Sequence, residues 1–252
     1  MTDASDTASV PPGPLPVSLY VHVPFCGSKC AYCDFHSAAE DPSRLITDAD
    51  GVVYYVRSRL PEAASLADAF VECVLAYLEE FSVDGLLVDV PTLYVGGGTP
   101  TLLGPALPRM VRGIRELVGL RRGAEITVEA NPCSLTPALA AALADEGVTR
   151  VSLGVQSFDD EVLHTLGRAH DAAQAREAAG LVAAAGMRLS LDLMCGVPGQ
   201  SAESWAETLR AAVECGAGHA SVYRWRSRRA RRWRPRWLRA WSRSRTRMWQ
   251  PR

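Results

Sequence analysis

The sequence predicts an α/β fold, a partial (β/α)6 barrel of parallel strands followed by an irregular basic tail. Between residues 18 and 223, short β-branched runs alternate with longer stretches of helical periodicity. This alternation is typical of parallel strands joined by crossover helices. Polar or glycine residues also stand at the ends of these runs. The carboxyl ends of parallel strands share one rim, and ligands bind there, so these residues are expected to meet at one site.

Six strands and five helices are expected in this region. The strands are residues 18–25, 91–98, 125–131, 150–157, 189–198 and 219–224. The clearest helices are Leu66–Phe81, Pro105–Val118, Thr136–Glu146, Ala172–Ala185 and Ser201–Glu214. Thr136, Pro137 and Ser201 are typical helix starts, and Gly147, Gly186 and Gly216 are typical stops. Residues 38–61 are longer than an ordinary βα loop, which predicts a surface excursion or lid.

Composition divides the chain into three parts. Its 252 residues are 48% apolar, enough for one large domain, expected over residues 17–223. Residues 1–16 contain acids but no Lys, Arg or apolar run, which predicts a disordered leader rather than a secretion signal. Residues 224–252 hold 13 of the 27 basic residues, so the preceding part carries 14 basic and 28 acidic residues. The main body is therefore acidic and the tail strongly basic.

No run of 18 apolar residues occurs, so no membrane span is expected and a cytoplasmic location is predicted. In that reducing compartment, closely spaced cysteines favour a metal site over disulfides. Cys26, Cys30 and Cys33 form a C-x3-C-x2-C pattern after the first expected strand. A cubane iron-sulfur cluster needs four ligands, so three thiolates leave one iron open. Two alternatives are structural cysteines and a zinc site completed by a residue such as His36.

The cysteine pattern resembles the signature of radical S-adenosylmethionine (SAM) proteins. The resemblance implies that the three cysteines hold a [4Fe-4S] cluster and that the amino and carboxylate groups of SAM chelate its open iron. It also implies that an electron from the reduced cluster cleaves SAM to a 5′-deoxyadenosyl radical. A reductant such as flavodoxin or ferredoxin would then be a partner.

Three consecutive glycines in "LYVGGGTPTLL" strengthen the resemblance. Glycine lets the backbone pass close to a ligand, and it exposes backbone groups to that ligand. No Lys-Ser/Thr pair follows, which argues against a phosphate-binding P-loop. By resemblance, Gly97, Gly98 and Thr99 hold the amino group and methionine portion of SAM. A simple tight turn is the alternative.

Four polar residues at later strand ends complete the expected SAM site. Glu129 stands among apolar neighbours, where an unpaired carboxylate is costly, so it needs a partner such as a ligand. Gln156 ends the next strand and Arg168 follows; an Arg fork suits the SAM carboxylate, although pairing with Asp159 is an alternative. Asp192 ends the fifth strand, where it can accept hydrogen bonds from ribose hydroxyls.

Two tyrosines are further candidates for the cofactor site. Tyr20 precedes the cysteine motif and Tyr32 lies within it; both are assigned to SAM binding by stacking, although aromatic packing explains them equally well. His22 has the same ambiguity and is assigned no catalytic role.

The combined motifs "YVHVPFCGSKCAYCDF", "GGGTPT", "EANP" and "DLMCGVPGQ" resemble the oxygen-independent coproporphyrinogen III oxidase branch. Oxidases of that branch tend to have a further cysteine two positions after the triad, and Phe35 stands there. The resemblance therefore favours the haem chaperones of the HemW type, which bind haem and deliver it to an acceptor protein. The alternative is an oxidase that converts coproporphyrinogen III to protoporphyrinogen IX.

The tail after Tyr223 departs from the branch, which would continue with an "EEGTPL"-like loop and a further domain. The tail has 13 arginines and five tryptophans, a composition that could engage nucleic acid by phosphate pairing and stacking. However, no amphipathic register is visible. With GC-rich codons, "RWRSRRARRW" can be read two bases later as "VALEEGTPL". A frameshift near Tyr223 is therefore the preferred hypothesis, and nucleic-acid binding or a nonfunctional fragment are the alternatives.

Overall fold

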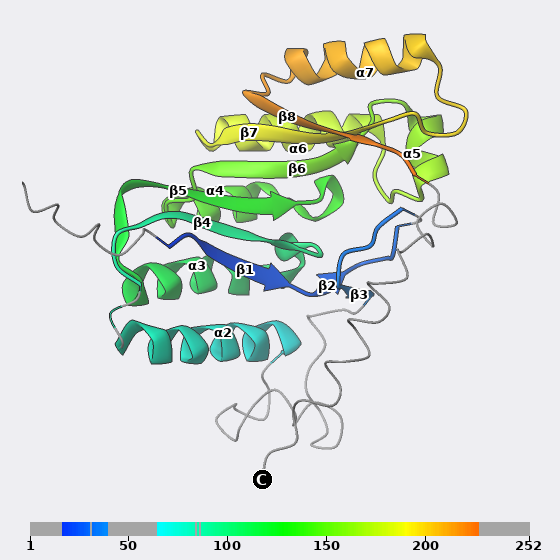
Figure 1. Ribbon diagram of the computed structural model, residues 1–252. Helices are drawn as coiled ribbons and strands as arrows, with labels where there is room; N and C mark the ends of the chain where they lie inside the picture. The colour runs from blue at the N-terminus through cyan, green and yellow to red at the C-terminus, as the bar shows by residue number, and fades with distance from the viewer. Residues whose placement is uncertain (1–16, 31, 40–64, 84, 86, 227–252) are drawn as a thin grey trace, which may run out of the picture.

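A six-stranded parallel sheet forms the centre of the molecule (Figure 1). The computed structural model describes residues 17–30, 32–39, 65–83, 85 and 87–226. The strands are β1 (Leu19–Val23), β4 (Val90–Gly97), β5 (Leu120–Ala130), β6 (Arg150–Gln156), β7 (Arg188–Cys195) and β8 (His219–Arg224). They lie side by side in that order, so each strand pairs with the one before it in the sheet. All six expected strands are confirmed.

The five expected helices are also confirmed, with ends shifted by one or two residues. They are α2 (Leu66–Val83), α3 (Ala106–Leu117), α4 (Pro137–Asp145), α6 (Ala172–Ala184) and α7 (Ala202–Glu214). The caps explain two of the starts. Thr136 accepts a hydrogen bond from the Leu139 N–H, and Ser201 accepts one from the Ser204 N–H. Each cap satisfies a backbone donor that has no partner within the helix.

Sequence analysis missed one helix, α5 (Asp160–Leu166). At seven residues it is too short to show helical periodicity. Its two capping residues, Asp159 and Gly167, could nevertheless have been recognised in the sequence. Asp159 accepts hydrogen bonds from the N–H groups of Glu161 and Val162, and Gly167 ends the helix at φ 71°, which favours glycine. Two short strands after β1, β2 (Phe25–Cys26) and β3 (Ala38–Ala39), also pair in parallel.

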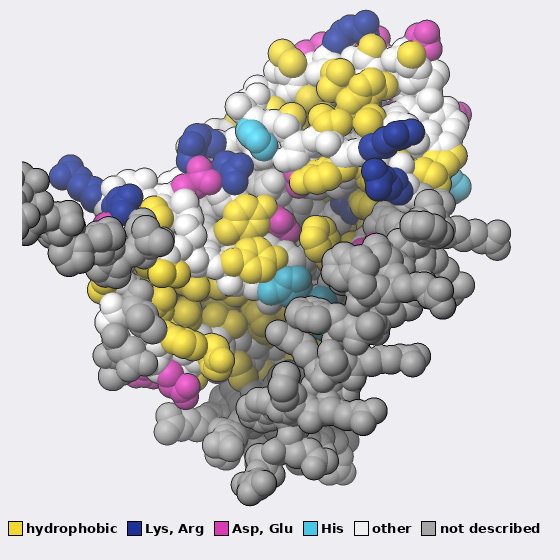
Figure 2. All heavy atoms as spheres, in the orientation of Figure 1, with side chains coloured by type: hydrophobic (Ala, Val, Ile, Leu, Met, Phe, Trp, Pro, Cys, Tyr) yellow, Lys and Arg dark blue, Asp and Glu magenta, His cyan; other side chains and the backbone are white. Residues whose placement is uncertain are grey.

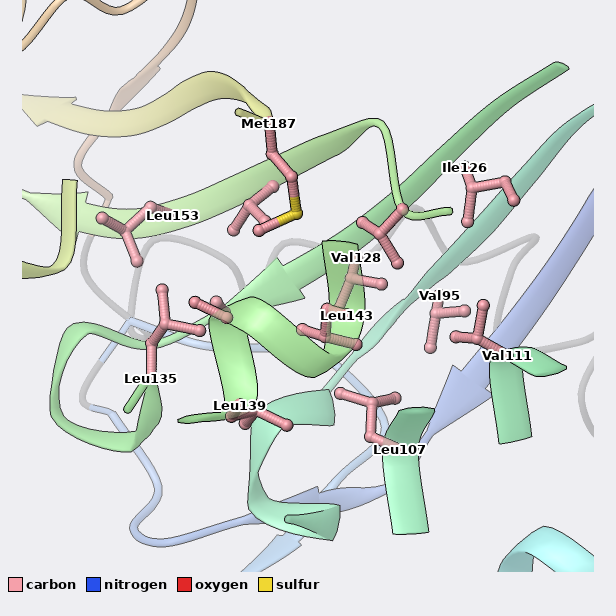
Figure 3. Close-up of a cluster of buried hydrophobic side chains, with 14 of the residues drawn as sticks. Val95, Leu107, Val111, Ile126, Val128, Leu135, Leu139, Leu143, Leu153 and Met187 are labelled. Carbon is pink, nitrogen blue, oxygen red and sulfur yellow. The ribbon is translucent and has the colours of Figure 1, made fainter. Parts of the chain in front are cut away.

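Side chains alternate between two faces of the sheet, and one face packs against the helices. On β6, Val151, Leu153 and Val155 are fully buried. Figure 3 shows Leu153 near Leu135 and Leu139, close to the α4 segment. In Figure 1, α4 and α6 lie behind the sheet. The apolar face therefore holds the core, which the hydrophobic effect drives out of water.

The opposite face is polar. On β6 it carries Ser152 and Gln156, which alternate with the apolar residues and are also buried. The register aligns polar side chains across the sheet: Ser152 pairs with Glu129 on one side and Ser190 on the other, and Ser190 pairs with His219. In the orientation of Figure 1, the space-filling view shows acidic, basic and histidine side chains beside apolar ones on this face (Figure 2).

Several expectations concern residues outside the described part. The disordered leader at 1–16, residues 40–61 of the expected lid and residues 227–252 of the tail all lie there. The first tail residue, Arg224, belongs to β8, where it pairs with Cys195. Among the described residues, no helix combines the length and hydrophobicity required to cross a membrane.

Candidate functional site

A cavity of about 1140 Å³ lies over the polar face of the sheet and includes the carboxyl ends of the strands. It brings together all but one of the residues assigned from the sequence to a cluster or to SAM. They are Cys26, Cys30, Cys33, Tyr32, Gly97, Gly98, Thr99, Glu129, Gln156, Arg168 and Asp192. The convergence follows from the parallel topology, which places the ends of all six strands on one side.

The cysteine loop leaves β2 and folds over the edge of this cavity. Cys26 is buried at the end of β2, and Cys30 and Cys33 are partly buried. The Cys33 N–H donates to the Cys30 carbonyl at 3.2 Å, which forms a tight turn between them. Lys29 closes the loop, because its Nζ donates to the carbonyls of Phe35 (2.6 Å) and Ser37 (3.1 Å). All seven cysteines lie in the described residues, and none forms a disulfide.

Arg168 connects the cysteine loop to β6. Its Nη1 donates to Cys30 Sγ and to the Tyr32 hydroxyl, both at 3.4 Å, and its Nη2 donates to the Gly154 carbonyl at 2.7 Å. Its Nε is buried without a hydrogen-bond partner. The alternative of a pair with Asp159 is not seen, since Asp159 caps α5 and accepts from Ser204 Oγ at 2.5 Å. The guanidinium therefore faces the cavity beside a cysteine.

The glycine run passes directly beneath the cysteine loop. The Gly98 N–H donates to the Val23 carbonyl and the Thr99 N–H to the Phe25 carbonyl, each at 2.7 Å. A Cβ at Gly98 would lie 2.2 Å from the Phe25 oxygen, which no side chain tolerates. Gly97 has φ 113°, and a Cβ at this position would lie 2.7 Å from the His22 ring. These N–H groups are used within the protein, so the glycines provide close passage rather than free donors.

Glu129 is held by two neighbours on this face. The Tyr94 hydroxyl donates to its Oε1 at 2.8 Å, and the Gly97 N–H donates to its Oε2 at 3.0 Å. Burial raises the pKa of the Glu129 carboxyl despite these hydrogen bonds. Sequence analysis expected a partner for the Glu129 carboxylate, and two residues of the protein itself, Tyr94 and Gly97, are such partners. Tyr94 was missed, although its alternation with the buried Leu93 and Val95 places it on the cavity face.

Asp192 lies on β7 and, like Glu129, lines the cavity. Ser152 Oγ donates to its Oδ2 at 3.2 Å, and Ser221 on β8 also hydrogen-bonds to it. Burial raises the pKa of the Asp192 carboxyl. Ser152 and Ser221 are cavity residues that sequence analysis missed, and the period-two alternation of their strands was the available signal.

Gln156 ends β6 with an unusual backbone. Its φ is 69°, a left-handed conformation that is uncommon for residues other than glycine. The ladder with β7 shifts register between Leu153 and Gln156, which turns this residue toward the cavity. The buried ring of His170 hydrogen-bonds through Nε2 to the preceding carbonyl, that of Val155, at 3.0 Å. This contact holds the Val155 carbonyl beside the left-handed Gln156.

Of the two tyrosines assigned to the cofactor, one lines the cavity and the other does not. Tyr32 lines the cavity, and burial raises the pKa of its hydroxyl. Tyr20 is not brought to the cavity: its side chain is 53% exposed, and its hydroxyl shares a hydrogen bond with His22 Nδ1 at 3.1 Å. Its ring lies 5.9 Å from that of Tyr94, so it packs behind a cavity residue.

The residues present fit a cluster with an adjacent SAM. Three thiols on one short loop match the donor set of a cubane cluster with one open iron. Within the described part of the chain, no three His, Cys, Asp or Glu side chains are arranged to hold a single metal ion. A cluster distributes its thiolates over separate irons, so it does not need them at one point. The buried, unpartnered Arg168 Nε and the glycine passage further indicate a site shaped for a polar ligand.

Comparisons with known proteins agree with this geometry. The model of the radical SAM superfamily matches residues 20–212. The haem chaperone HemW of Escherichia coli (strain K12) is 38% identical over 218 residues, which are 82% of this chain and 50% of that protein. HemW of Mycobacterium tuberculosis (strain H37Rv) is 37% identical over 211 residues, 82% of this chain and 49% of that protein. The chain thus spans about half the length of these curated relatives.

One solved structure gives the same family, and a second gives the same fold. Coproporphyrinogen III oxidase (HemN) from Escherichia coli, a radical SAM enzyme, aligns with a TM-score of 0.64 and 28% identity over 84% of this chain and 44% of that one. Methylornithine synthase (PylB) aligns with a TM-score of 0.55 at 14% identity over 84% of this chain and 55% of that one, a likeness of fold alone. With its cysteine loop, its parallel sheet and the match over residues 20–212, the chain belongs to the radical SAM superfamily.

Proposed function

We propose that this chain is the radical SAM portion of a haem chaperone. The observation that carries the proposal is the cavity itself, in which three cysteines on one loop lie together with Glu129 of β5, Asp192 of β7 and Arg168, which follows α5. The haem part is supported by the curated relatives, which are haem chaperones. It is also supported by Phe35, a 61% exposed side chain at the cavity, where the resembling oxidases have a cysteine.

Each cavity residue has a physical task in this proposal. Cys26, Cys30 and Cys33 hold the cluster, and the buried Arg168 guanidinium offers its unpartnered Nε to the SAM carboxylate. Asp192 and Gln156 face the ribose from adjacent strands. When bound, the cluster and SAM together supply one-electron and radical chemistry, while the protein supplies orientation and electrostatics.

Three further parts of the proposal concern partners and place. Haem is the cargo, and an acceptor protein receives it. A small electron-transfer protein such as flavodoxin or ferredoxin reduces the cluster. The protein works in the cytoplasm, where thiols stay reduced and available as cluster ligands.

The first test addresses the cluster. The purified chain is reconstituted anaerobically with iron and sulfide, reduced, and examined by electron paramagnetic resonance with and without SAM. We expect a [4Fe-4S]⁺ signal that shifts when SAM is added and disappears in Cys30→Ala. Cys215→Ala is the matched control, because Cys215 caps α7 outside the cavity and should keep the signal. A folded protein that binds zinc or no cluster would overturn the radical SAM reading.

The second test separates chaperone from oxidase. The reconstituted protein is incubated with coproporphyrinogen III, SAM and a reductant, and in a parallel sample with haemin. We expect stoichiometric haem binding and transfer to an apo-haemoprotein, with no vinyl product from coproporphyrinogen III. Protoporphyrinogen IX formation would instead support the oxidase alternative.

A further inference from the structure

The cavity continues beyond the cluster and SAM residues, along β7 and β8. This part, here called the β8 arm, is lined by Arg150, Ser190, His219, Ser221, Tyr223 and Arg224. The cavity volume of about 1140 Å³ lies just above the range of about 300–1,000 Å³ usual for a small-molecule site. A ligand in the β8 arm would lie beside the residues proposed for SAM, because Ser221 on β8 hydrogen-bonds to Asp192.

His219 is the one histidine of five that lines the cavity, and all five lie in the described residues. His22 has both ring nitrogens engaged, with Tyr20 and with the His36 carbonyl. His170 is buried away from the cavity and bonds the Val155 carbonyl. His36 and His164 are exposed outside it. An imidazole is therefore available to a cavity ligand only from β8.

The ring of His219 is oriented by its neighbours. Its Nδ1 shares a hydrogen bond with Ser190 Oγ at 2.9 Å. Ser190 Oγ lies 3.5 Å from Ser152 Oγ, which in turn hydrogen-bonds to the Asp192 carboxylate at 3.2 Å. With Nδ1 held by Ser190, Nε2 is the ring nitrogen that no hydrogen bond occupies among the described residues. Metal-binding histidines commonly offer one ring nitrogen to the metal while a hydrogen bond at the other holds the ring.

We propose that His219 Nε2 is the axial ligand of the haem iron when haem occupies the β8 arm. This inference rests on the proposed function. Imidazole is a common protein ligand of haem iron, and a hydrogen bond at the opposite ring nitrogen orients the ring. Two cations lie in the same arm to pair with the haem propionates. Arg224 is exposed, and Arg150 uses its Nε for Glu125 and Thr127.

The test titrates haemin into the full-length wild-type chain and into three variants. His219→Ala removes the imidazole, His219→Gln keeps a polar group that can bond Ser190, and His164→Ala is the matched control on the exposed side of α5. Absorption in the Soret region and electron paramagnetic resonance of the ferric haem report the axial ligand. Circular dichroism and cluster content report whether each variant is folded.

We expect a histidine-ligated spectrum in the wild type and in His164→Ala. Both His219 variants should lose that spectrum and bind haemin at least about tenfold more weakly. Adding free imidazole to His219→Ala should restore the spectrum, an effect that a merely structural role would not produce. Wild-type haem binding with an unchanged spectrum in folded His219→Gln would overturn this inference and leave the chaperone proposal standing. Absence of haem binding to the wild type would instead overturn the proposed function, and this inference with it.

Discussion

Arg168 and Cys30 stand 138 residues apart in the chain, yet Arg168 Nη1 donates to Cys30 Sγ at 3.4 Å. The same guanidinium bonds the Gly154 carbonyl at the end of β6. The guanidinium is thus a cationic neighbour of one of the three cysteines proposed to hold the cluster. Arg168 thus joins the two halves of the cavity, the cysteine loop and the strand ends.

Replacing Arg168 should weaken SAM binding more than cluster binding. In Arg168→Lys the charge remains, but a single ammonium cannot bond Cys30, Gly154 and a ligand carboxylate from one plane. We expect SAM affinity to fall about 10- to 100-fold, since a hydrogen bond to a charged group contributes about 1.5–3 kcal/mol. The SAM-induced shift of the cluster signal measures this affinity. Arg210→Lys, in an exposed pair with Glu207, should leave it unchanged.

Gly98→Ala should destabilise the fold. The new Cβ would meet the Phe25 carbonyl at 2.2 Å, so the strand carrying Cys26 has to move. We expect a loss of about 1–3 kcal/mol or more in the free energy of unfolding, together with loss of cluster. Gly180→Ala on α6 is the matched control: nothing lies within 4 Å of its Cβ, and alanine favours a helix interior. Equal melting temperatures for both variants would contradict the close passage.

Glu129→Gln should separate stability from SAM binding. Burial raises the pKa of Glu129 above its ordinary value of 4.5, so the folded protein holds this proton more tightly than the unfolded chain does. The contribution of Glu129 to stability therefore falls as pH rises from about 4.5 through the raised pKa, and the cost persists above it.

At neutral pH, Glu129→Gln removes the cost of the buried charge, but its amide N–H then faces a donor, either the Tyr94 hydroxyl or the Gly97 N–H. These two effects oppose each other, so the SAM-free protein should melt close to wild type. The SAM-induced shift of the cluster signal should nevertheless weaken. Thermal denaturation at several pH values, with SAM titration at pH 7, gives both readouts. A variant that melts well below wild type at pH 7 but binds SAM normally would refute this account.

His170 should make the fold sensitive to acid. Burial lowers the pKa of this side chain to about 4 from an ordinary 6.5, and its exposed fraction is only 3%. The unfolded chain binds the proton first as pH falls, so stability is lost between pH 6.5 and about 4, by about 3 kcal/mol for this shift.

His170→Gln removes that titration while an amide N–H can still bond the Val155 carbonyl. Its free energy of unfolding should therefore depend less on pH over this window than that of wild type. His164→Gln, an exposed change on α5, should keep the wild-type dependence. Denaturant titrations at pH 4.5, 5.5 and 6.5 compare the three proteins, and parallel curves for wild type and His170→Gln would exclude the effect.

Much of the site was readable in the linear chain because it is local. Cys26, Cys30 and Cys33 lie within eight residues, so their spacing alone places them on one loop. Gly98 could be recognised as a point of close passage because only glycine lacks a Cβ. The strands and helices were readable for a similar reason, since periods of 2 and 3.6 are set by backbone geometry within each element.

The residues that sequence analysis missed depend on contacts between strands. Tyr94 and Ser152 belong to the cavity only because the register places them beside Glu129, and Ser221 because β8 pairs with β7 opposite Asp192. Nothing in the linear spacing gives that register. The short α5 was missed because seven residues carry too little periodicity, even though both of its caps were present.

The sequence by itself determined the cysteine triad, the glycine passage, the order of strands and helices and the polar residues that end each strand, because each is a property of a few neighbouring residues. Only the tertiary structure decided that Arg168 contacts Cys30, that Tyr20 stays outside the cavity and that His219 is the histidine inside it. The physical reason is that contacts across a sheet depend on register and strand curvature. Both result from the packing of the whole apolar core rather than from any single segment.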